Sequence, residues 1–425
     1  MKRSIKAIAA AAAALTLTFS CVPMTYAVNG APAAQTDEEN TGKLEFTEGT
    51  SIETPYNGTA QLVGEDGTVY YSGYDKKSTR CLIIYTLDEN GEIKNSYSVD
   101  RYVNDKGEEI GVANSRLKQC GDRIYLIYSE CWQFSTRENV IVELDKELNE
   151  ISKHRYEKGY SIDTNGEKVV YIKRDKIYLC DIDGKNLKKL YAVDNSDENA
   201  KHEQPLNSVA IAGNYVGFQK RTGYQDDPDR KEYCGIIDIE TGEIELHEER
   251  SVEQAHSAGG KLIWYGDQGY DVGGEQDGEI PTDAVSADKY WNKHYKYYST
   301  SELYIFDGKE YSVLKTPNAK EVGYGTTIDS DGDIITTSFD GKGHVIYRIY
   351  RDKKLIGEHT VSYKGYSGAV MGNGTITVNY TGRDSTPDDW IGYDPMTTSY
   401  EEVQAMIDVT PAAKDTMKSV TISYK

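Results

Sequence analysis

Short runs of β-branched, aromatic and aliphatic residues recur along the chain, and turns rich in Gly, Asp or Asn separate them. The segment KVVYIKRDKIYLCDIDGKNLKKLY (168–191) is an example, in which three charged residues separate two apolar runs and a DIDG turn leads to a third. Such a pattern predicts strands joined in antiparallel hairpins. Sharp turns form readily there because Gly tolerates positive φ and Asp or Asn bonds its own backbone.

A hairpin of this kind recurs seven times, and a second hairpin with a Gly-centred turn precedes each copy. The repeating unit is therefore four antiparallel strands, written seven times between residues 55 and 403. The turns of the seven hairpins lie at Asp88, Asp145, Asp183, Glu240, Asp307, Asp352 and Asp394.

A four-stranded unit has two edges and two faces to cover, and stacking copies around an axis covers both. We therefore predict an all-β fold, a seven-bladed β-propeller of four-stranded antiparallel blades, with eight blades as the alternative. The alternative arises because KLEFTEG (43–49) and SVTISYK (419–425) are strand-like and lie outside the seven units. Pairing these segments, or adding one of them to an edge blade, would close the ring, and the sequence leaves both arrangements open.

The segment 168–191 resembles a repeat of the TolB-type, WD40-like β-propellers, in which a strand reaches a D-x-D-G turn and a K-x-L run follows. The resemblance is clear in this blade and looser in the other six. It supports the propeller fold. It also implies that the chain binds peptides or other proteins in the cell envelope, as such propellers often do.

The N-terminal residues predict export. Lys2, Arg3 and Lys6 precede an apolar run, and small residues near Ala27 suit cleavage, so we expect a signal peptide over 1–27. Residues 28–45 are polar and unpatterned, which predicts a flexible spacer before a propeller over 46–425. We expect a secreted, extracellular or cell-envelope protein.

Cys21 would be the only lipidation site near this leader. The residues before it, Thr18-Phe19-Ser20, suit lipid attachment poorly, so a lipoprotein is not expected. No other stretch has the roughly 20 apolar residues of a membrane span.

The composition excludes some partners. The formal net charge of −21 disfavours nucleic acid and anionic membranes, which require a basic surface. Five scattered cysteines would follow the leader, without a C-x-x-C pattern, so neither a disulfide framework nor a zinc site is expected. We expect a monomer, because so acidic a surface repels copies of itself.

Candidate binding residues lie in the long connections between the second and third strands of a unit, residues 129–139, 219–233, 266–302 and 379–390. These connections share one end of a propeller, and long loops on a rigid scaffold often form binding surfaces. Their aromatic and charged residues suit sugar rings or peptide side chains, although they could instead only cover the inserts. The candidate ligand-binding residues are Trp132, Tyr224, Tyr290, Trp291, His294, Tyr295, Arg383 and Trp390.

No metal, cofactor or catalytic site is predicted. Asp329, Asp331 and Asp333 in DSDGD resemble part of a Ca²⁺ loop but lack its later acidic ligand, so calcium remains only an alternative to a hairpin turn. GYSGA around Ser367 does not match G-x-S-x-G, and HEERS at His247 lacks the second His of H-E-x-x-H.

Three functions fit these patterns. We favour an exported binding or scaffold propeller that holds a peptide, protein or glycan on its long-loop face. The alternatives are a hydrolase or lyase that acts on polysaccharides, and a structural surface propeller without a small ligand. A carboxylate pair for glycoside hydrolysis cannot be recognised among 69 acidic residues without distances.

Overall fold

The fold is described from a computed structural model of the 425-residue chain. The expected signal peptide and most of the expected spacer lie outside the residues that the structure describes. No helix within the described residues is long and apolar enough to cross a membrane. The described residues are 44–74, 82–132, 135–159, 161–193, 205–222, 231–249, 252, 254–266, 270–271, 295–296, 302–315, 322–328, 332–339, 344–383, 402, 405–406 and 414–425.

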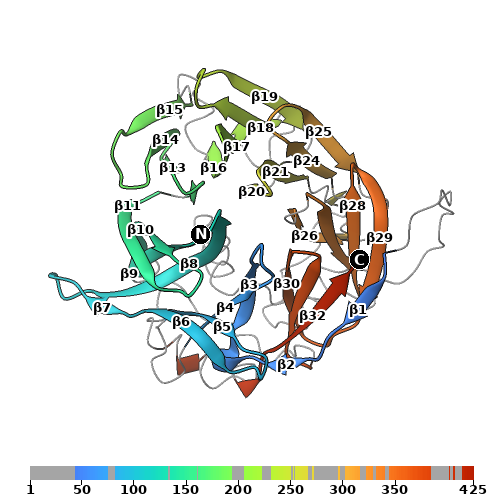
Figure 1. The fold of residues 1–425 in the computed structure, drawn as a ribbon. Helices are drawn as coiled ribbons and strands as arrows, with labels where there is room; N and C mark the ends of the chain where they lie inside the picture. Colours follow the sequence, from blue (N-terminus) through green and yellow to red (C-terminus); the bar gives the residue numbers. More distant parts are fainter. Residues whose placement is uncertain are drawn as a thin grey trace, which may run out of the picture.

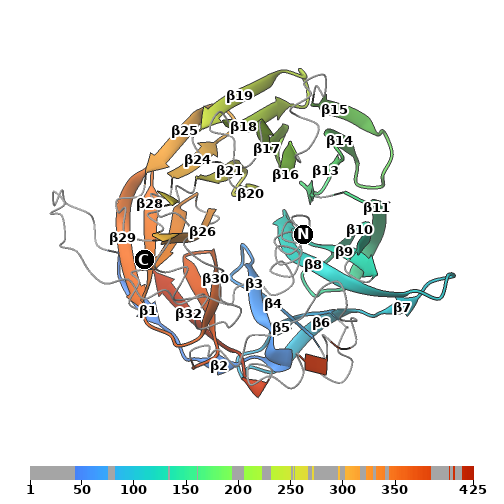
Figure 2. The same cartoon turned by 180° about the vertical axis from the view of Figure 1, so that it is seen from behind.

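Seven antiparallel sheets surround a central axis, with the first strand of each sheet nearest the axis (Figures 1 and 2). The first three blades are built in chain order. Blade 1 contains β3 (Thr59–Val63), β4 (Val69–Tyr74), β5 (Leu82–Leu87) and β6 (Ile93–Val99). Blade 2 contains β8 (Glu109–Cys120), β9 (Arg123–Trp132), β10 (Ser135–Leu144) and β11 (Glu150–Glu157), and β7 (Tyr102–Val103) pairs with β8. Blade 3 contains β12 (Ile162–Thr164), β13 (Lys168–Lys173), β14 (Lys176–Asp181) and β15 (Lys188–Ala192).

The next three blades continue the ring in the same order. Blade 4 contains β16 (Leu206–Ala212), β17 (Tyr215–Thr222), β18 (Lys231–Asp238) and β19 (Ile244–Glu249). Blade 5 contains β20 (Ala255–Ala258), β21 (Lys261–Gly266), β24 (Glu302–Phe306) and β25 (Tyr311–Lys315). Blade 6 contains β26 (Val322–Ile328), β27 (Ile334–Phe339), β28 (Val345–Arg351) and β29 (Lys354–Val361). A small hairpin of β22 (Tyr270–Asp271) and β23 (Tyr295–Lys296) lies in the connection between β21 and β24.

Blade 7 joins the two ends of the chain. Its strands are β30 (Tyr366–Gly372), β31 (Thr375–Tyr380), the C-terminal β32 (Lys418–Tyr424) and the N-terminal β1 (Phe46–Glu48). Phe46 pairs with Tyr424, and the following β2 (Ile52–Glu53) also pairs with β32. The predicted seven-bladed, all-β fold is thus confirmed, and the two terminal segments close the ring by pairing with each other.

The predicted source of the last two strands of blade 7 is wrong, and the hairpin expected there lies outside the described residues. The hairpin was expected to turn at Asp394 and to supply the last two strands, but β32 and β1 take those places. The error has a physical reason: a hydrogen-bonded strand can come from any part of the chain, and ring closure favours pairing between the two ends.

The burial pattern explains why the middle strands read as continuous apolar runs. In β5, β9 and β28 successive residues are buried, because both faces of each sheet pack against neighbouring blades. Outer strands such as β6 and β19 are largely exposed. Between blades 1 and 2, for example, Leu82 and Ile84 pack with Leu126, Val140 and Val142 in one core cluster.

Buried polar side chains hold the links between blades. Asn379 of blade 7 accepts a hydrogen bond from Ala60 N at 2.9 Å and donates to Ala60 O at 3.3 Å. Gln219 of blade 4 donates to Val252 O in the link to blade 5, and Glu232 accepts from Val252 N at 2.6 Å. These bonds satisfy backbone groups that the sheets leave unpaired.

Candidate functional site

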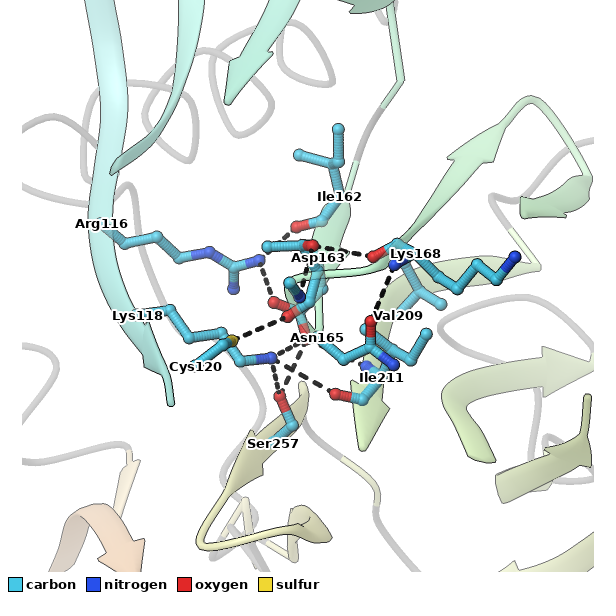
Figure 3. A network of polar contacts seen from close by, with 12 residues as sticks. Arg116, Lys118, Cys120, Ile162, Asp163, Asn165, Lys168, Val209, Ile211 and Ser257 are labelled. Carbon is cyan, nitrogen blue, oxygen red and sulfur yellow. Dashed lines mark hydrogen bonds and ion pairs between the residues drawn. The ribbon is translucent and has the colours of Figure 1, made fainter. Parts of the chain in front are cut away.

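A polar network lies near the axis, where four inner strands reach their short turns. Lys118 on β8, Asp163 on β12, Ile211 on β16 and Ser257 on β20 each lie within two residues of the end of their strand. Because these strands run in the same direction along the axis, the four residues meet at one level (Figure 3). We call this end of the ring the short-turn end.

The Asp163 carboxylate is the centre of the network. It is buried, with 3% of its side chain exposed. Its Oδ2 accepts hydrogen bonds from Lys118 Nζ at 2.9 Å, Ser257 Oγ at 2.8 Å and Ile211 N at 2.9 Å. Its Oδ1 lies 3.2 Å from Arg116 Nη2. A buried carboxylate needs this number of donors to offset its desolvation.

Lys118 links blades that are not neighbours. Its Nζ also donates to Ser257 Oγ at 2.6 Å and to Ile211 O at 3.3 Å. Lys118 belongs to blade 2 and Ser257 to blade 5, and blades three places apart in a ring of seven are as far apart as the ring allows. The side chains therefore bridge the centre of the ring at the short-turn end.

The charges of the network are set by burial and by the two cations. Burial raises the pKa of Asp163, but Lys118 and Arg116 outweigh it, and the pKa lies below its usual range. Burial and the nearby Arg116 lower the pKa of His256, on β20, to about 4. At neutral pH Asp163 is therefore ionised and His256 neutral. A general acid needs a raised pKa, so Asp163 does not suit that role in a polysaccharide hydrolase.

The opposite end of the ring, which we call the long-connection end, carries the connections between second and third strands and the links between blades. Here blade 2 departs from the other blades: β8, β9 and β10 contain 12, 10 and 10 residues. The hairpin of β7 and the start of β8 forms an arm that projects outward from the ring, at the left of Figure 1, and β9 and β10 extend the sheet beside β8. We call residues 101–113 and 129–138 the blade-2 extension.

The blade-2 extension corrects one sequence prediction. Residues 129–139 were expected to form a loop between the second and third strands. Instead β9 continues to Trp132 and β10 resumes at Ser135, and these two residues pair with each other. The polar residues in SECWQFSTREN suggested a loop, but strands can be polar where one face is wet.

The blade-2 extension combines a fixed polar contact with exposed apolar groups. Glu130, which is buried, accepts from Tyr102 Oη at 2.8 Å and from Arg155 Nη2 at 3.0 Å. Tyr102 and Val103 remain 42% and 65% exposed. Among the described residues β11 pairs with β10 only as far as Glu138, so residues 135–137 of β10 have no described strand on that side and form a sheet edge there.

The structure places only three of the eight candidate ligand-binding residues. Trp132 ends β9, and Tyr295 in β23 pairs with Asp271 of β22, but the side chains of Trp132 and Tyr295 are outside the described part. Arg383 Nε contacts Asp415 Oδ1 at 2.7 Å, so this side chain ties the chain after β31 to the residues that lead into β32. The remaining candidates lie outside the described residues: Tyr224, Tyr290, Trp291, His294 and Trp390. Whether the candidates share one binding face therefore remains a prediction.

The possible calcium loop is only partly described. Asp329 and Asp331 lie outside the described residues. The carboxylate of Asp333 is held by Arg351, whose Nε and Nη2 lie 2.8 and 2.7 Å from its two oxygens. Within the described residues no three His, Cys, Asp or Glu side chains gather in a way that could hold a metal ion. Four cysteines in that part of the chain, Cys120, Cys131, Cys180 and Cys234, are free thiols.

The axis network was missed by the sequence analysis. Its residues lie in SRLKQC, SIDTNG and AHSAGG, which were read only as the first strands and turns of their units. One signal was available: Lys118, Asp163 and Ser257 each lie three residues before a turn glycine. At the same position blades 4 and 7 have the apolar residues Ala210 and Met371.

β-Propeller domains are among the solved structures that this chain is similar to. No family model and no curated protein matches the chain. Among solved structures, the Cps50 (Swd1) β-propeller domain of Myceliophteria thermophila is 10% identical, with a TM-score of 0.49 over 89% of this chain and 99% of that one. BamB from Moraxella catarrhalis is 11% identical, with a TM-score of 0.40 over 89% and 97% of the two chains. The β-propeller domain of the Trilobed protease from Pyrococcus furiosus is 16% identical, with a TM-score of 0.39 over 63% and 79%. The resemblance to propeller repeats is confirmed as a resemblance of fold, and it carries no argument about partners or activity.

Proposed function

We propose that this propeller is an exported, monomeric binding protein that holds an extended polypeptide segment of a partner protein at its long-connection end. The proposal rests on the difference between the two ends of the ring. Side chains of the axis network bridge the centre of the short-turn end. The long-connection end carries the blade-2 extension.

The blade-2 extension is the observation that carries the proposal. An unpaired sheet edge and exposed apolar side chains favour aggregation, and proteins usually cover or shorten such edges. In blade 2 the chain lengthens the strands of the sheet instead. It also holds the exposed Tyr102 in place through a hydrogen bond to the buried Glu130. An extended polypeptide can add to a sheet edge through main-chain hydrogen bonds while apolar pockets select its side chains. A glycan has no main-chain groups of this kind, so the extension favours a polypeptide ligand.

Export is supported by the N-terminal sequence pattern described above. An acidic propeller without a catalytic motif suits a binding role in the cell envelope or outside the cell. The carboxylate of the axis network, Asp163, gives no support to a polysaccharide-acting enzyme, because it is ion-paired with Arg116 and Lys118.

The experiment is a selection of extended peptides from a displayed library against the folded chain of residues 44–425. Selected peptides are then tested for binding to a Tyr102→Ala, Val103→Ser double variant. The matched control is Ile244→Ser, Leu246→Ser, which removes an apolar pair of similar exposure (42% and 40%) from β19 of blade 4.

We expect the double variant in the blade-2 extension to bind selected peptides at least about tenfold more weakly than the wild-type chain, with the control unchanged. Equal binding by the two variants, or a peptide library that yields no binders, would contradict the proposal. Circular dichroism and melting of each variant verify that the ring remains folded.

A further inference from the structure

Arg116 is fixed beside the axis but only partly bonded. Its Nη2 donates to Ile162 O and lies 3.2 Å from Asp163 Oδ1. Its Nε and Nη1 donors have no partner within the part of the chain that the structure describes. The side chain is 42% exposed. Its neighbours Ile162 and Asp163 on β12 and His256 on β20 all belong to inner strands, so Arg116 lies beside the axis.

The orientation of Arg116 is set before any ligand arrives. Asp163 is held by Lys118, Ser257 and the backbone of Ile211, so it gives the guanidinium a rigid anchor. Figure 3 shows Arg116 reaching toward Ile162 and Asp163 from β8. A guanidinium fixed in this way loses little conformational entropy when it binds an anion.

The charges around Arg116 leave one positive charge in excess. Lys118 lies on the same strand as Arg116, the ionised Asp163 lies on β12, and the neutral His256 lies on β20. The strand β16 contributes only the backbone of Ile211. Two cations and one carboxylate give a local charge of +1. This excess stands out in a chain whose formal net charge is −21.

We propose that Arg116 is the recognition residue of an anion site on the axis of the ring, and that its ligand is a single carboxylate group. One carboxylate neutralises the local charge of +1, whereas a phosphate dianion would leave the site with a net negative charge. The turn at Gly121 belongs to the short-turn end, and Arg116 lies two residues farther from this turn than Lys118 does. The hydrogen bond between Lys118 and Ser257 therefore lies between Arg116 and the short-turn end. The carboxylate therefore enters from the long-connection end. The site does not require the proposed polypeptide ligand, because a small free acid would also fill it.

The test is a nuclear magnetic resonance titration of the folded chain, monitored at the main-chain amides of Arg116, Asp163 and Ser257. Three carboxylates distinguish the source of the group: acetate, N-acetylglycine as a peptide C-terminus, and N-acetylaspartate N-methylamide as an acidic side chain. N-acetylglycinamide, which lacks the charge, is the ligand control. The variants are Arg116→Gln and, as a matched control, Arg351→Gln, since Arg351 also holds a buried carboxylate, Asp333, but lies in blade 6.

We expect saturable shifts with at least one carboxylate, none with N-acetylglycinamide, and a loss of affinity of about tenfold or more in Arg116→Gln but not in Arg351→Gln. If Arg116→Gln does not fold, Arg116→Lys is used instead, because lysine keeps the positive charge but lacks the two parallel N–H donors of the guanidinium. This variant should bind the carboxylate several-fold more weakly than the wild-type chain. The absence of saturable shifts, equal binding by the Arg116 variants and the wild-type chain, or equal shifts with the uncharged amide would overturn the proposal. Failure here would leave the proposed peptide binding at the blade-2 extension intact, because that selection uses other residues.

Discussion

The ammonium of Lys118 donates a 2.6 Å hydrogen bond to the hydroxyl of Ser257, and these residues belong to blades on opposite sides of the ring. Both also bond the same oxygen of Asp163. The inner strands of blades 2 to 5 are thus held together by side chains as well as by packing.

Asp163→Asn should destabilise the fold strongly. The substitution leaves Lys118 and Arg116 partly buried without their counter-charge, at a cost of about 3 to 5 kcal/mol. Chemical denaturation measures the change in the free energy of unfolding. Asp183→Asn is the control, since its partner Lys185 is exposed and a surface ion pair of this kind contributes little to stability. Similar losses of unfolding free energy in both variants would show that Asp163 stabilises the fold no more than an exposed carboxylate does.

Gly217→Ala should destabilise the boundary between blades 4 and 5. A Cβ at Gly217 would lie 2.8 Å from Trp264 Cζ2 and 3.1 Å from Leu262, both in the buried core. Overpacking of this kind costs about 1 to 3 kcal/mol. Gly111→Ala is the matched control, because it is also a strand glycine and a Cβ there meets nothing within 4 Å. Equal melting temperatures for the two variants would contradict the packing described here.

Removal of the N-terminal strand should open the ring. A chain that begins at residue 55 lacks the hydrogen bonds of Glu45 with Lys425 and of Gly49 with Thr421, and it lacks the stacking of Phe46 on His359. We expect a loss of about 3 kcal/mol or more in the free energy of unfolding, and self-association through the uncovered β32. A chain that begins at residue 44 is the control. Size-exclusion chromatography and thermal melting compare the two, and identical behaviour would show that β1 is not needed for closure.

Stability should fall on acidification through the pH range where His256 titrates. Its pKa is about 4 in the fold and about 6.5 in the unfolded chain, so the unfolded state binds more protons between these values. The free energy of unfolding therefore decreases as the pH falls from 6.5 toward 4, by at most about 3 kcal/mol from this group.

His256→Gln removes this contribution, so the variant should lose less stability than the wild-type chain between pH 7.5 and pH 4.5. Denaturation at the two pH values measures the difference. His359, whose pKa burial also lowers, contributes with the same sign and remains in the variant. An unchanged pH dependence in His256→Gln would mean that its imidazole titrates normally.

The repeat of short strands and Gly or Asp turns was enough to predict the blades, because turn formation and burial on both faces depend on residues that are adjacent in the sequence. Asp88 shows why: its carboxylate accepts from the backbone of Asn90 and Glu92 within one turn. The origin of the last strands of blade 7 was not predictable in this way. The pairing of Phe46 with Tyr424 joins residues at opposite ends of the chain, and alternation alone does not specify the partner.

The candidate site was harder to predict for the same reason. Lys118, Asp163 and Ser257 are unremarkable within their own strands, and they form a network only when the ring brings those strands to one axis. The blade-2 extension was misread because polar residues around Trp132 suggested a loop rather than a long strand with one wet face.

The most direct test of the proposed function is hydrogen exchange, measured by mass spectrometry, with and without a selected peptide. The account predicts slower exchange in residues 101–113 and 129–138 of the blade-2 extension, and unchanged exchange at the short turns near Gly121, Gly166 and Gly213. Protection confined to those short turns, or no protection in the blade-2 extension, would contradict it.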